Sequence, residues 1–191
     1  MREVILASAS PGRKKLIKQL GIKVQFKSSY FNEAVSLKMA PVELAKYLSI
    51  QKAKIVAEQE KDAIVIAADT VVVLKNKILG KPKTPARAIN MLRQINGRKI
   101  STITGYTIID VRTKRRVTKS VETLVYIKKL TSREIADYVR TKEPLDKAGA
   151  FGIQARGAFI VRKIEGDYFN IIGLPLFSLV ESLRKFGVKV K

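Results

Sequence analysis

The stretch AIVIAADTVVVL, from Ala63 to Leu74, carries the strongest structural signal in the sequence. It is almost wholly apolar and rich in β-branched residues, which is typical of a strand buried on both faces of a sheet. One ionisable residue, Asp69, interrupts it. An ionised carboxylate in apolar surroundings is unfavourable unless it is paired, hydrogen-bonded or bound to a metal. Asp69-Thr70 is therefore either an exposed turn between two strands or an acid at the carboxyl edge of a sheet, where α/β proteins bind ligands.

The composition excludes several kinds of functional site. The chain has 191 residues, of which 46% are hydrophobic, so it has the size of one domain, in one or two lobes, and enough apolar side chains for a core. It contains no cysteine and no histidine, which excludes disulfides, thiolate zinc sites and triads with a histidine base. Acid–base chemistry therefore falls to carboxylates, lysines, tyrosines or a metal-bound water. No apolar run has the length of a membrane span, and the first residues do not resemble a signal peptide.

The net charge is strongly positive. With 38 basic and 16 acidic residues, the formal charge is +22. Such a surface attracts polyanions such as nucleotides, nucleic acid or anionic membranes, although a lysine-rich solvated surface without a dedicated partner has the same composition. The basic residues are spread along the chain rather than gathered in a tail, which argues against a disordered nucleic-acid-binding arm.

The first strand and helix are joined by a turn of a kind that binds anions. Residues 3–7 form a short apolar strand, and Ser10 can cap the following helix with Pro11 at its first position. Backbone N–H groups at such a helix start, with Arg13 nearby, make a cradle for an anion. Plain helix capping explains the same residues equally well.

Two further charged side chains, Glu33 and Lys52, would be functional only if the fold brings them close to Asp69. Glu33 follows a strand expected at residues 22–26, and a lone glutamate in a loop is usually only solvated. Lys52 lies on the apolar row of a helix from about residue 41 to 58. A lysine on the inner face of a helix needs an anion, although its stem can instead extend along the surface to solvent.

Helix and strand patterns alternate through the middle of the chain. Gly80-Lys81-Pro82 places a lysine on a stiff loop, because proline restricts both itself and its neighbour. Helices are expected over residues 84–96 and 131–140, the second with a capping box. Long strands are expected over residues 99–110 and 118–129.

The last third of the chain breaks this regular pattern. Residues 143–161, EPLDKAGAFGIQARGAFIV, combine small residues with two acids and Gln154, and such a loop lets the backbone approach a ligand closely. A hairpin is expected over residues 159–172, and Pro175 begins a last amphipathic helix. Strands alternate with helices early and a β-rich section follows, which predicts an α/β fold with a mixed sheet.

Six stretches of the sequence form a recognisable set. They are LASASPGR, the NE at residues 32–33, AADTVV, GKP, EPLDKAGAFGIQARG and GDYFNIIGLPL. Together they resemble the Maf family of nucleoside triphosphate pyrophosphatases. They run in the family's order from Leu6 to Pro175, over nearly the whole chain, and EPLDKAGAFGIQ alone is a specific signature.

The resemblance implies a fold, an activity and a cellular setting. The fold would be one α/β domain over residues 1–191, with two lobes, a central cleft and a long mixed sheet flanked by helices, similar to the inosine triphosphate pyrophosphatases. The activity would be cleavage of a nucleoside triphosphate between its α- and β-phosphates. A divalent cation is implied, Mg²⁺ first, with Mn²⁺ or Co²⁺ as alternatives. A cytoplasmic homodimer is also implied, with no membrane partner and with nucleic acid not expected. Family members are associated with housecleaning of nucleotide pools and with septum inhibition.

The resemblance also assigns roles to residues of this chain. Asp69 would activate water or hold the metal that does, and Glu33 would give the metal a second carboxylate. The residues that would contact the triphosphate are Ser8, Arg13, Lys52 and Lys81. Thr70 and Gln154 are similar to the subgroup that hydrolyses dTTP and UTP.

The chain departs from the family pattern at three positions. Gly12 stands where most members have the first of two arginines, a residue linked to substrate choice. Phe151 replaces the usual tyrosine, and Asn32 replaces the usual aspartate. A broad or purine-directed housecleaning enzyme is therefore one alternative. Another alternative is a basic regulatory protein that binds nucleic acid without turnover.

Overall fold

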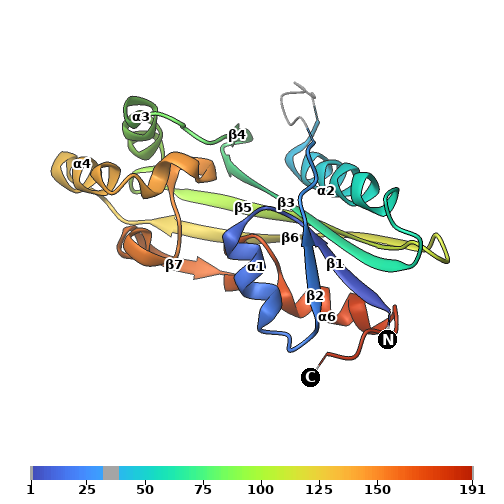
Figure 1. Ribbon diagram of the computed structural model, residues 1–191. Helices are drawn as coiled ribbons and strands as arrows, with labels where there is room; N and C mark the ends of the chain where they lie inside the picture. The colour runs from blue at the N-terminus through green and yellow to red at the C-terminus, as the bar shows by residue number, and fades with distance from the viewer. Residues whose placement is uncertain (1, 32–38, 191) are drawn as a thin grey trace. The chain divides into compact units, whose positions relative to one another are not determined.

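The computed structural model describes residues 2–31 and 39–190. It shows a mixed seven-stranded sheet flanked by helices (Figure 1). The strand order is β2-β1-β3-β5-β6-β7, with β4 paired to β3. The strands are β1 (Glu3–Ala7), β2 (Val24–Lys27), β3 (Ala63–Leu74), β4 (Lys77–Leu79), β5 (Lys99–Asp110), β6 (Arg116–Ile127) and β7 (Val161–Glu165). The helices are α1 (Pro11–Lys18), α2 (Pro41–Ala57), α3 (Pro85–Ile95), α4 (Ser132–Arg140), α5 (Tyr168–Ile172) and α6 (Leu176–Arg184). The expected α/β fold class is confirmed.

The chain divides into two compact units. Unit 1 comprises Met1–Asp69, Thr104–Val121 and Gly173–Lys191, and unit 2 comprises Thr70–Ile103 and Glu122–Ile172. Strand β3 passes from the first unit to the second between Asp69 and Thr70. Along the described part of the chain, none of the helices combines the length and the apolar character that a membrane crossing requires.

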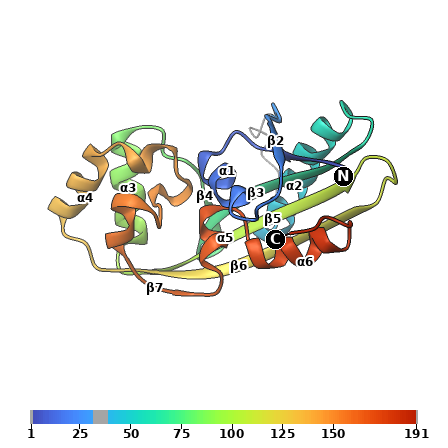
Figure 2. The same cartoon turned by 60° about the horizontal axis from the view of Figure 1, so that its bottom comes forward.

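In unit 1, helices α2 and α6 cover opposite faces of the sheet (Figures 1 and 2). Neighbouring residues of a strand point to opposite faces, and β5 shows this directly. The Tyr106 hydroxyl donates to the Ser178 carbonyl of α6 at 2.8 Å, whereas the Thr107 hydroxyl bonds to Ser49 of α2 at 2.7 Å. A Cβ on Gly105 would lie 2.4 Å from the α2 backbone, so the close approach of α2 to the sheet requires glycine there.

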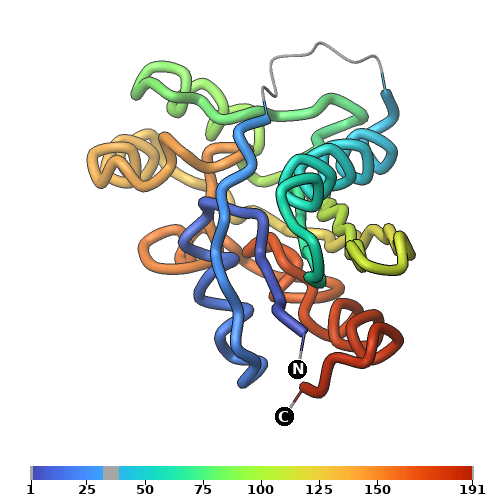
Figure 3. The backbone as a smooth tube through the Cα atoms, turned by 45° about the vertical axis from the view of Figure 1, so that its right-hand side comes forward, coloured from blue at the N-terminus to red at the C-terminus, as the bar shows by residue number. Residues whose placement is uncertain are grey.

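Strand β1 organises the edge of the sheet where the site begins. It pairs in parallel with β2 on one side and with β3 on the other, and Figure 3 shows β1 and β2 side by side. The last residues that β1 and β3 pair are Leu6 and Ile66. Ser8 comes directly after β1, and Asp69 lies three residues beyond Ile66 in β3, so both lie toward the carboxyl end of the β1–β3 pair.

Unit 2 has its own apolar core. The second half of β3 packs with α3, α4 and the ends of β5 and β6, and Val72, Leu92 and Tyr138 are among the buried residues. Helix α3 has a large apolar stripe, with Ala88, Leu92 and Ile95 buried. These i, i+4, i+7 positions are the pattern of an amphipathic helix.

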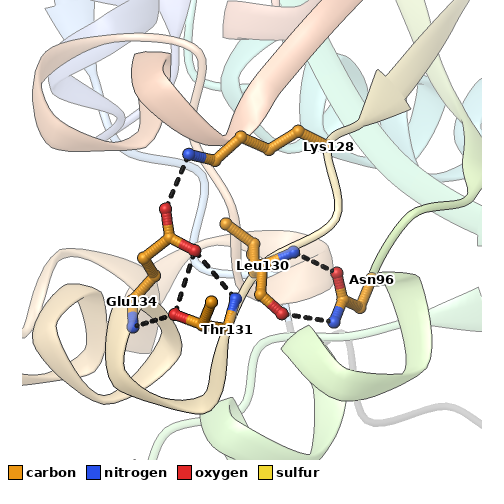
Figure 4. Close-up of polar contacts among 5 residues, drawn as sticks. All are labelled: Asn96, Lys128, Leu130, Thr131 and Glu134. Carbon is orange, nitrogen blue, oxygen red and sulfur yellow. Dashed lines mark hydrogen bonds and ion pairs between the residues drawn. The ribbon is translucent and has the colours of Figure 1, made fainter.

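Hydrogen bonds fix the start of α4 beside the end of α3 (Figure 4). The Asn96 side chain bonds both the N–H and the carbonyl of Leu130, at 2.7 and 2.9 Å. Thr131 and Glu134 form the expected capping box, and Lys128 donates to Glu134 at 2.7 Å. The bond from Lys128 and those from Thr131 lower the pKa of Glu134 to about 2.

Two expectations about local structure are wrong. Asp69-Thr70 is not an exposed turn, because β3 runs unbroken through both residues. Residues 159–172 do not form a hairpin, because β7 is followed by helix α5. The Asp167 carboxylate accepts hydrogen bonds from the N–H groups of Phe169 and Asn170, at 2.7 and 3.3 Å. Asp167 therefore caps a helix start.

Candidate active site

The centre of the candidate site is a buried ion pair between Asp69 and Lys52. The two side chains form a short hydrogen-bonded contact between Lys52 Nζ and Asp69 Oδ1. Asp69 is 7% exposed and Lys52 is 8% exposed. Helix α2 presents Lys52 from the same buried row as Leu48, and β3 presents Asp69 from the sheet below. The inner-face interpretation of Lys52 is therefore confirmed, and the anion that it meets is the acid that interrupts the apolar strand.

This pairing explains how the apolar strand accommodates a charge. An isolated carboxylate in the interior carries a desolvation cost of several kcal/mol, and an opposite charge in hydrogen-bonding contact offsets much of it. The pair is weak evidence for added stability, since two apolar residues would serve as well. The pair therefore accounts for the burial of Asp69 and leaves its role to be argued from the chemistry of the site.

The turn after β1 holds a second group of predicted residues. The Ser8 hydroxyl accepts a hydrogen bond from the N–H of Ser10 at 3.2 Å, and the Ser10 hydroxyl accepts one from the N–H of Arg13 at 3.4 Å. Helix α1 begins with Pro11 and is capped as expected. Ser8 is buried, so its hydroxyl lies inside the fold at the helix start rather than in solvent.

Arg13 is tied to a segment far along the chain. Its Nε donates to the carbonyl oxygen of Gly173 at 2.7 Å. Gly173 has φ near +114°, a conformation that favours glycine. This contact joins the SPGR turn to the GLPL segment, and sequence reasoning missed it. Gly12 lies in the first turn of α1 beside Arg13, so a side chain at that position would project from the same helix start.

Lys81 belongs to unit 2, on the exposed loop between β4 and α3. Two backbone hydrogen bonds join this loop to the segment 143–157, which we call the signature segment. Gly149 N donates to Gly80 O at 3.1 Å, and Lys83 N donates to Leu145 O at 3.0 Å. The signature segment therefore holds the Lys81 loop through one hydrogen bond before the lysine and one after it.

The predicted specificity residues differ in exposure. Thr70 is partly buried in β3, and Gln154 is exposed immediately before a 3₁₀ turn over Ala155–Ile160. Phe151, where the family usually has tyrosine, is buried in the core of unit 2. Glu33, the second predicted metal ligand, and Asn32 lie outside the described residues.

The described residues therefore fall into two groups. Ser8, Arg13, Lys52 and Asp69 belong to unit 1, and Thr70, Lys81 and Gln154 belong to unit 2. Within unit 1, Lys52 and Asp69 are in direct contact, and the strand register brings Ser8 to the same end of the β1–β3 pair.

The donor chemistry of Asp69 fits a hard cation. Mg²⁺ prefers oxygen ligands and usually takes one or two carboxylates together with substrate phosphates. Among residues 2–31 and 39–190, no cluster of three or more acidic, histidine or cysteine side chains forms a complete protein-only metal site. Among the described residues, Asp69 would supply the carboxylate for such a cation, together with oxygens from the substrate.

Positive charge is distributed unevenly in unit 2. Residues 70–103 contain no acidic residue, and each of their basic residues is exposed. These basic residues are Lys75, Lys77, Lys81, Lys83, Arg87, Arg93, Arg98 and Lys99. Among the described residues, none of these eight takes part in an ion pair, whereas Lys128, Arg140, Lys147 and Lys163 each contact a carboxylate. We call residues 70–103 the acid-free stretch.

The fold and these side chains define a class: a mixed-sheet α/β protein with a buried acid–lysine pair at the carboxyl end of its central parallel strands. The family follows from comparison with known proteins. A model described as "Maf-like protein" matches residues 3–186, and the chain belongs to the Maf family.

Curated relatives match over essentially the full chain. A dTTP/UTP pyrophosphatase from Methanosarcina mazei is 45% identical over 191 residues, which cover 100% of this chain and 97% of the relative. A dTTP/UTP pyrophosphatase from Alkaliphilus oremlandii is 46% identical over 185 residues, covering 96% of each chain. A solved dITP/XTP pyrophosphatase from Mycobacterium abscessus has a TM-score of 0.49 at 13% identity, covering 96% of this chain and 97% of that one. The family assignment rests on the sequence matches alone.

Proposed function

We propose that this protein hydrolyses nucleoside triphosphates to a nucleoside monophosphate and pyrophosphate, with dTTP and UTP as preferred substrates. The observation that carries the proposal is the buried contact between Asp69 and Lys52, at the positions where the family has its catalytic acid and a triphosphate-binding lysine. The names of the full-length relatives support the substrate class.

The proposed reaction is a displacement at the α-phosphorus. The oxygen of a water molecule forms a bond to the α-phosphorus while the bond to the α–β bridging oxygen breaks, and pyrophosphate leaves with that oxygen. The Asp69 carboxylate accepts a proton from the water. Proton transfer to a positioned carboxylate contributes about 10²-fold or more to such rates.

The cations of the site neutralise the phosphates. Phosphoryl chemistry depends mainly on positioning and on charge neutralisation. Arg13 is positioned by its bond to Gly173, and Lys81 is positioned by the backbone bonds on either side of its loop. In the proposed complex the Lys52 ammonium turns from Asp69 toward a phosphate oxygen. The carboxylate is then open to water and to a cation.

A divalent cation is part of the proposal. Asp69 would hold it, with Glu33 as the second ligand that the family pattern predicts. Such an ion neutralises phosphate charge and increases the acidity of a bound water. Metal dependence is tested by comparing pyrophosphate release with Mg²⁺, Mn²⁺, Co²⁺ and EDTA.

The primary experiment is a nucleotide panel. The purified protein is incubated with Mg²⁺ and each common nucleoside triphosphate, and pyrophosphate and monophosphate are both measured. We expect equal amounts of the two products and the highest kcat/KM with dTTP and UTP. Absence of pyrophosphate release from every nucleotide, with the fold intact by circular dichroism, would refute the proposal. Sedimentation of the same sample tests the expected homodimer.

Gly12 supports a second candidate, a broader housecleaning pyrophosphatase. No side chain projects from the position where most family members have an arginine linked to substrate choice. If breadth arises from this absence, Gly12→Arg should raise the ratio of kcat/KM for dTTP to that for purine triphosphates, by about fivefold or more. A ratio that is already high in the unchanged protein, and that Gly12→Arg does not alter, would reject this candidate.

A further inference from the structure

The short loop from Gly152 to Gly157 closes on itself within unit 2. A Cβ on Gly157 would lie 2.1 Å from the Gly152 carbonyl oxygen and 2.6 Å from the Tyr138 hydroxyl. The two ends of the loop are therefore packed against each other and against Tyr138, and only glycine fits at the closing position. Gln154 lies between these ends and is exposed.

One carboxylate anchors this loop. Glu143 Oε2 accepts a hydrogen bond from the N–H of Arg156, and Oε1 accepts one from the N–H of Gly157, both at 3.0 Å. The Tyr138 hydroxyl donates to Glu143 Oε1 at 3.2 Å and accepts from the N–H of Gly152 at 3.2 Å. Glu143 thus holds the end of the loop directly and its beginning through Tyr138.

Tyr138 is suited to this double role. It is 1% exposed, and burial together with the nearby Glu143 charge raises the pKa of its phenol. The hydroxyl therefore remains protonated over the physiological range. A protonated hydroxyl can donate to the carboxylate and accept from the backbone at the same time.

The anchors act on a strained backbone. Ala155 has φ near +49°, in the left-handed region that an alanine rarely adopts. A residue held there persists only where the surrounding structure fixes it. Ala155 follows Gln154 directly and precedes the anchored Arg156. Release of the anchors would let Ala155 relax to an ordinary conformation and would redirect the chain at Gln154.

We infer that Glu143 and Tyr138 are positioning residues that determine base selectivity by fixing the backbone on which Gln154 is mounted. This inference rests on the proposed function, in which the Gln154 amide distinguishes the polar edges of pyrimidine bases. A side-chain amide has a donor NH₂ group and an acceptor oxygen, so which base it can bind depends on which of the two groups faces the base. If the loop could reorient freely, Gln154 could present its donor or its acceptor to any pyrimidine, and the selectivity would be lost.

The test compares UTP with CTP, which differ at the base edge where UTP has a carbonyl and CTP an amine. The measured quantity is the ratio of kcat/KM for UTP to that for CTP. We expect Gln154→Ala to lower this ratio by about tenfold or more, and Glu143→Gln and Tyr138→Phe to lower it by about fivefold or more. Most of the loss should appear as a raised KM for UTP, because kcat depends on Asp69.

A double-mutant cycle between Glu143 and Gln154 distinguishes a positioning role of Glu143 from a general loss of stability. If Glu143 acts through Gln154, then Glu143→Gln introduced into Gln154→Ala should lower the ratio no further. Tyr106→Phe is the matched control, because Tyr106 is also buried and hydrogen-bonded but lies in unit 1. It should lower the melting temperature without changing the UTP-to-CTP ratio.

The outcomes distinguish this inference from the proposed function. No nucleotide turnover in the unchanged protein refutes both. Turnover with an unchanged ratio in folded Glu143→Gln and Tyr138→Phe overturns only the inference. Independent effects of Glu143→Gln and Gln154→Ala on the ratio also overturn it. If Glu143→Gln does not fold, Tyr138→Phe decides, because it keeps both backbone bonds to Glu143.

Discussion

Asp69 and Glu143 are two motif carboxylates that the fold treats in opposite ways. Asp69, in unit 1, contacts the ammonium of Lys52 at the end of a flexible side chain. Glu143, in unit 2, is bound by two backbone N–H groups and a tyrosine hydroxyl. None of the ion pairs among the described residues involves Glu143. One acid is compensated by the charge of a lysine side chain, and the other by the dipoles of two backbone N–H groups and a hydroxyl.

The difference indicates which acid can change partners. In the proposed complex Lys52 turns to a phosphate and leaves Asp69 open to water or to a cation, and this exchange changes the conformation of one side chain. Glu143 can release its partners only by opening the loop that they close. We therefore assign the chemistry to Asp69 and the positioning of the Gly152–Gly157 loop to Glu143.

The largest expected effect is on turnover at Asp69. Asp69→Asn should lower kcat by about 10²-fold or more, because the amide cannot accept the proton. Asp110→Asn is the matched control, since Asp110 is 3% exposed and paired with Arg2 in the same unit. Both variants should lose stability, and only the first should lose turnover. Equal kcat values in the two variants, measured by pyrophosphate release, would show that Asp69 has no catalytic role beyond that of a buried paired acid.

A stability effect is expected when Lys52 alone is changed. Lys52→Met leaves the Asp69 charge buried without its cation, and breaking such a pair from one side costs about 3 kcal/mol or more. Urea unfolding measures the free energy. Asp69→Asn combined with Lys52→Met should recover part of the loss, because the buried charge is gone. If the double variant is less stable than Lys52→Met alone, the pair does not behave as a compensated buried charge.

Asp110 should make the free energy of unfolding depend on pH in the acid range. Its hydrogen bond with Arg2 lowers its pKa from 3.8 to about 2. Because the folded-state pKa is the lower one, the stabilisation is complete above pH 4 and is lost as pH falls toward 2. Asp110→Asn should flatten the decline of unfolding free energy between pH 4 and 2. A decline in that variant as steep as in the unchanged protein would assign the acid sensitivity to other carboxylates.

The smallest expected effect concerns an acid that also contacts a lysine but is only partly buried. Glu134 bonds to Lys128 and caps α4, so a lysine contact alone does not mark a functional acid. Thr131→Ala removes the other half of the capping box and should cost about 1 kcal/mol. Pyrophosphate release should be unchanged by Thr131→Ala and by Glu134→Gln. A loss of kcat in either variant would show that burial does not separate the two kinds of acid–lysine contact.

Local periodicity was enough to predict the parts of the Asp69–Lys52 pair. The apolar run predicted the buried strand, and the helical row predicted that Lys52 faces inward. Neither pattern shows that the two residues meet, because that depends on how α2 lies on the sheet. The close approach at Gly105 permits this packing, and no periodic signal reveals it.

The anchors of the Gly152–Gly157 loop were beyond local patterns. The partners of Glu143 lie before and after it in the chain, on α4 and in the loop. The periodicity of α4 predicts that Tyr138 faces inward, but no local pattern shows which polar group its hydroxyl meets. The expected hairpin at residues 159–172 failed for a related reason. In the sequence, Asp167 after Gly166 is typical of a turn, but its carboxylate caps α5, and the same residue type serves both purposes.

The acid-free stretch has a consequence for how a ligand arrives. A triphosphate diffusing toward unit 2 meets a positive potential before it touches any side chain, and the range of that potential is about 8 Å at physiological ionic strength. Encounter should therefore be faster than for a neutral surface. Added NaCl should reduce kcat/KM while leaving kcat nearly constant, and charge-neutral variants at Lys75 and Lys77 should weaken that salt dependence. In dilute buffer, delivery of the nucleotide would then depend on lysines such as Lys75 and Lys77, to which the proposed reaction gives no role.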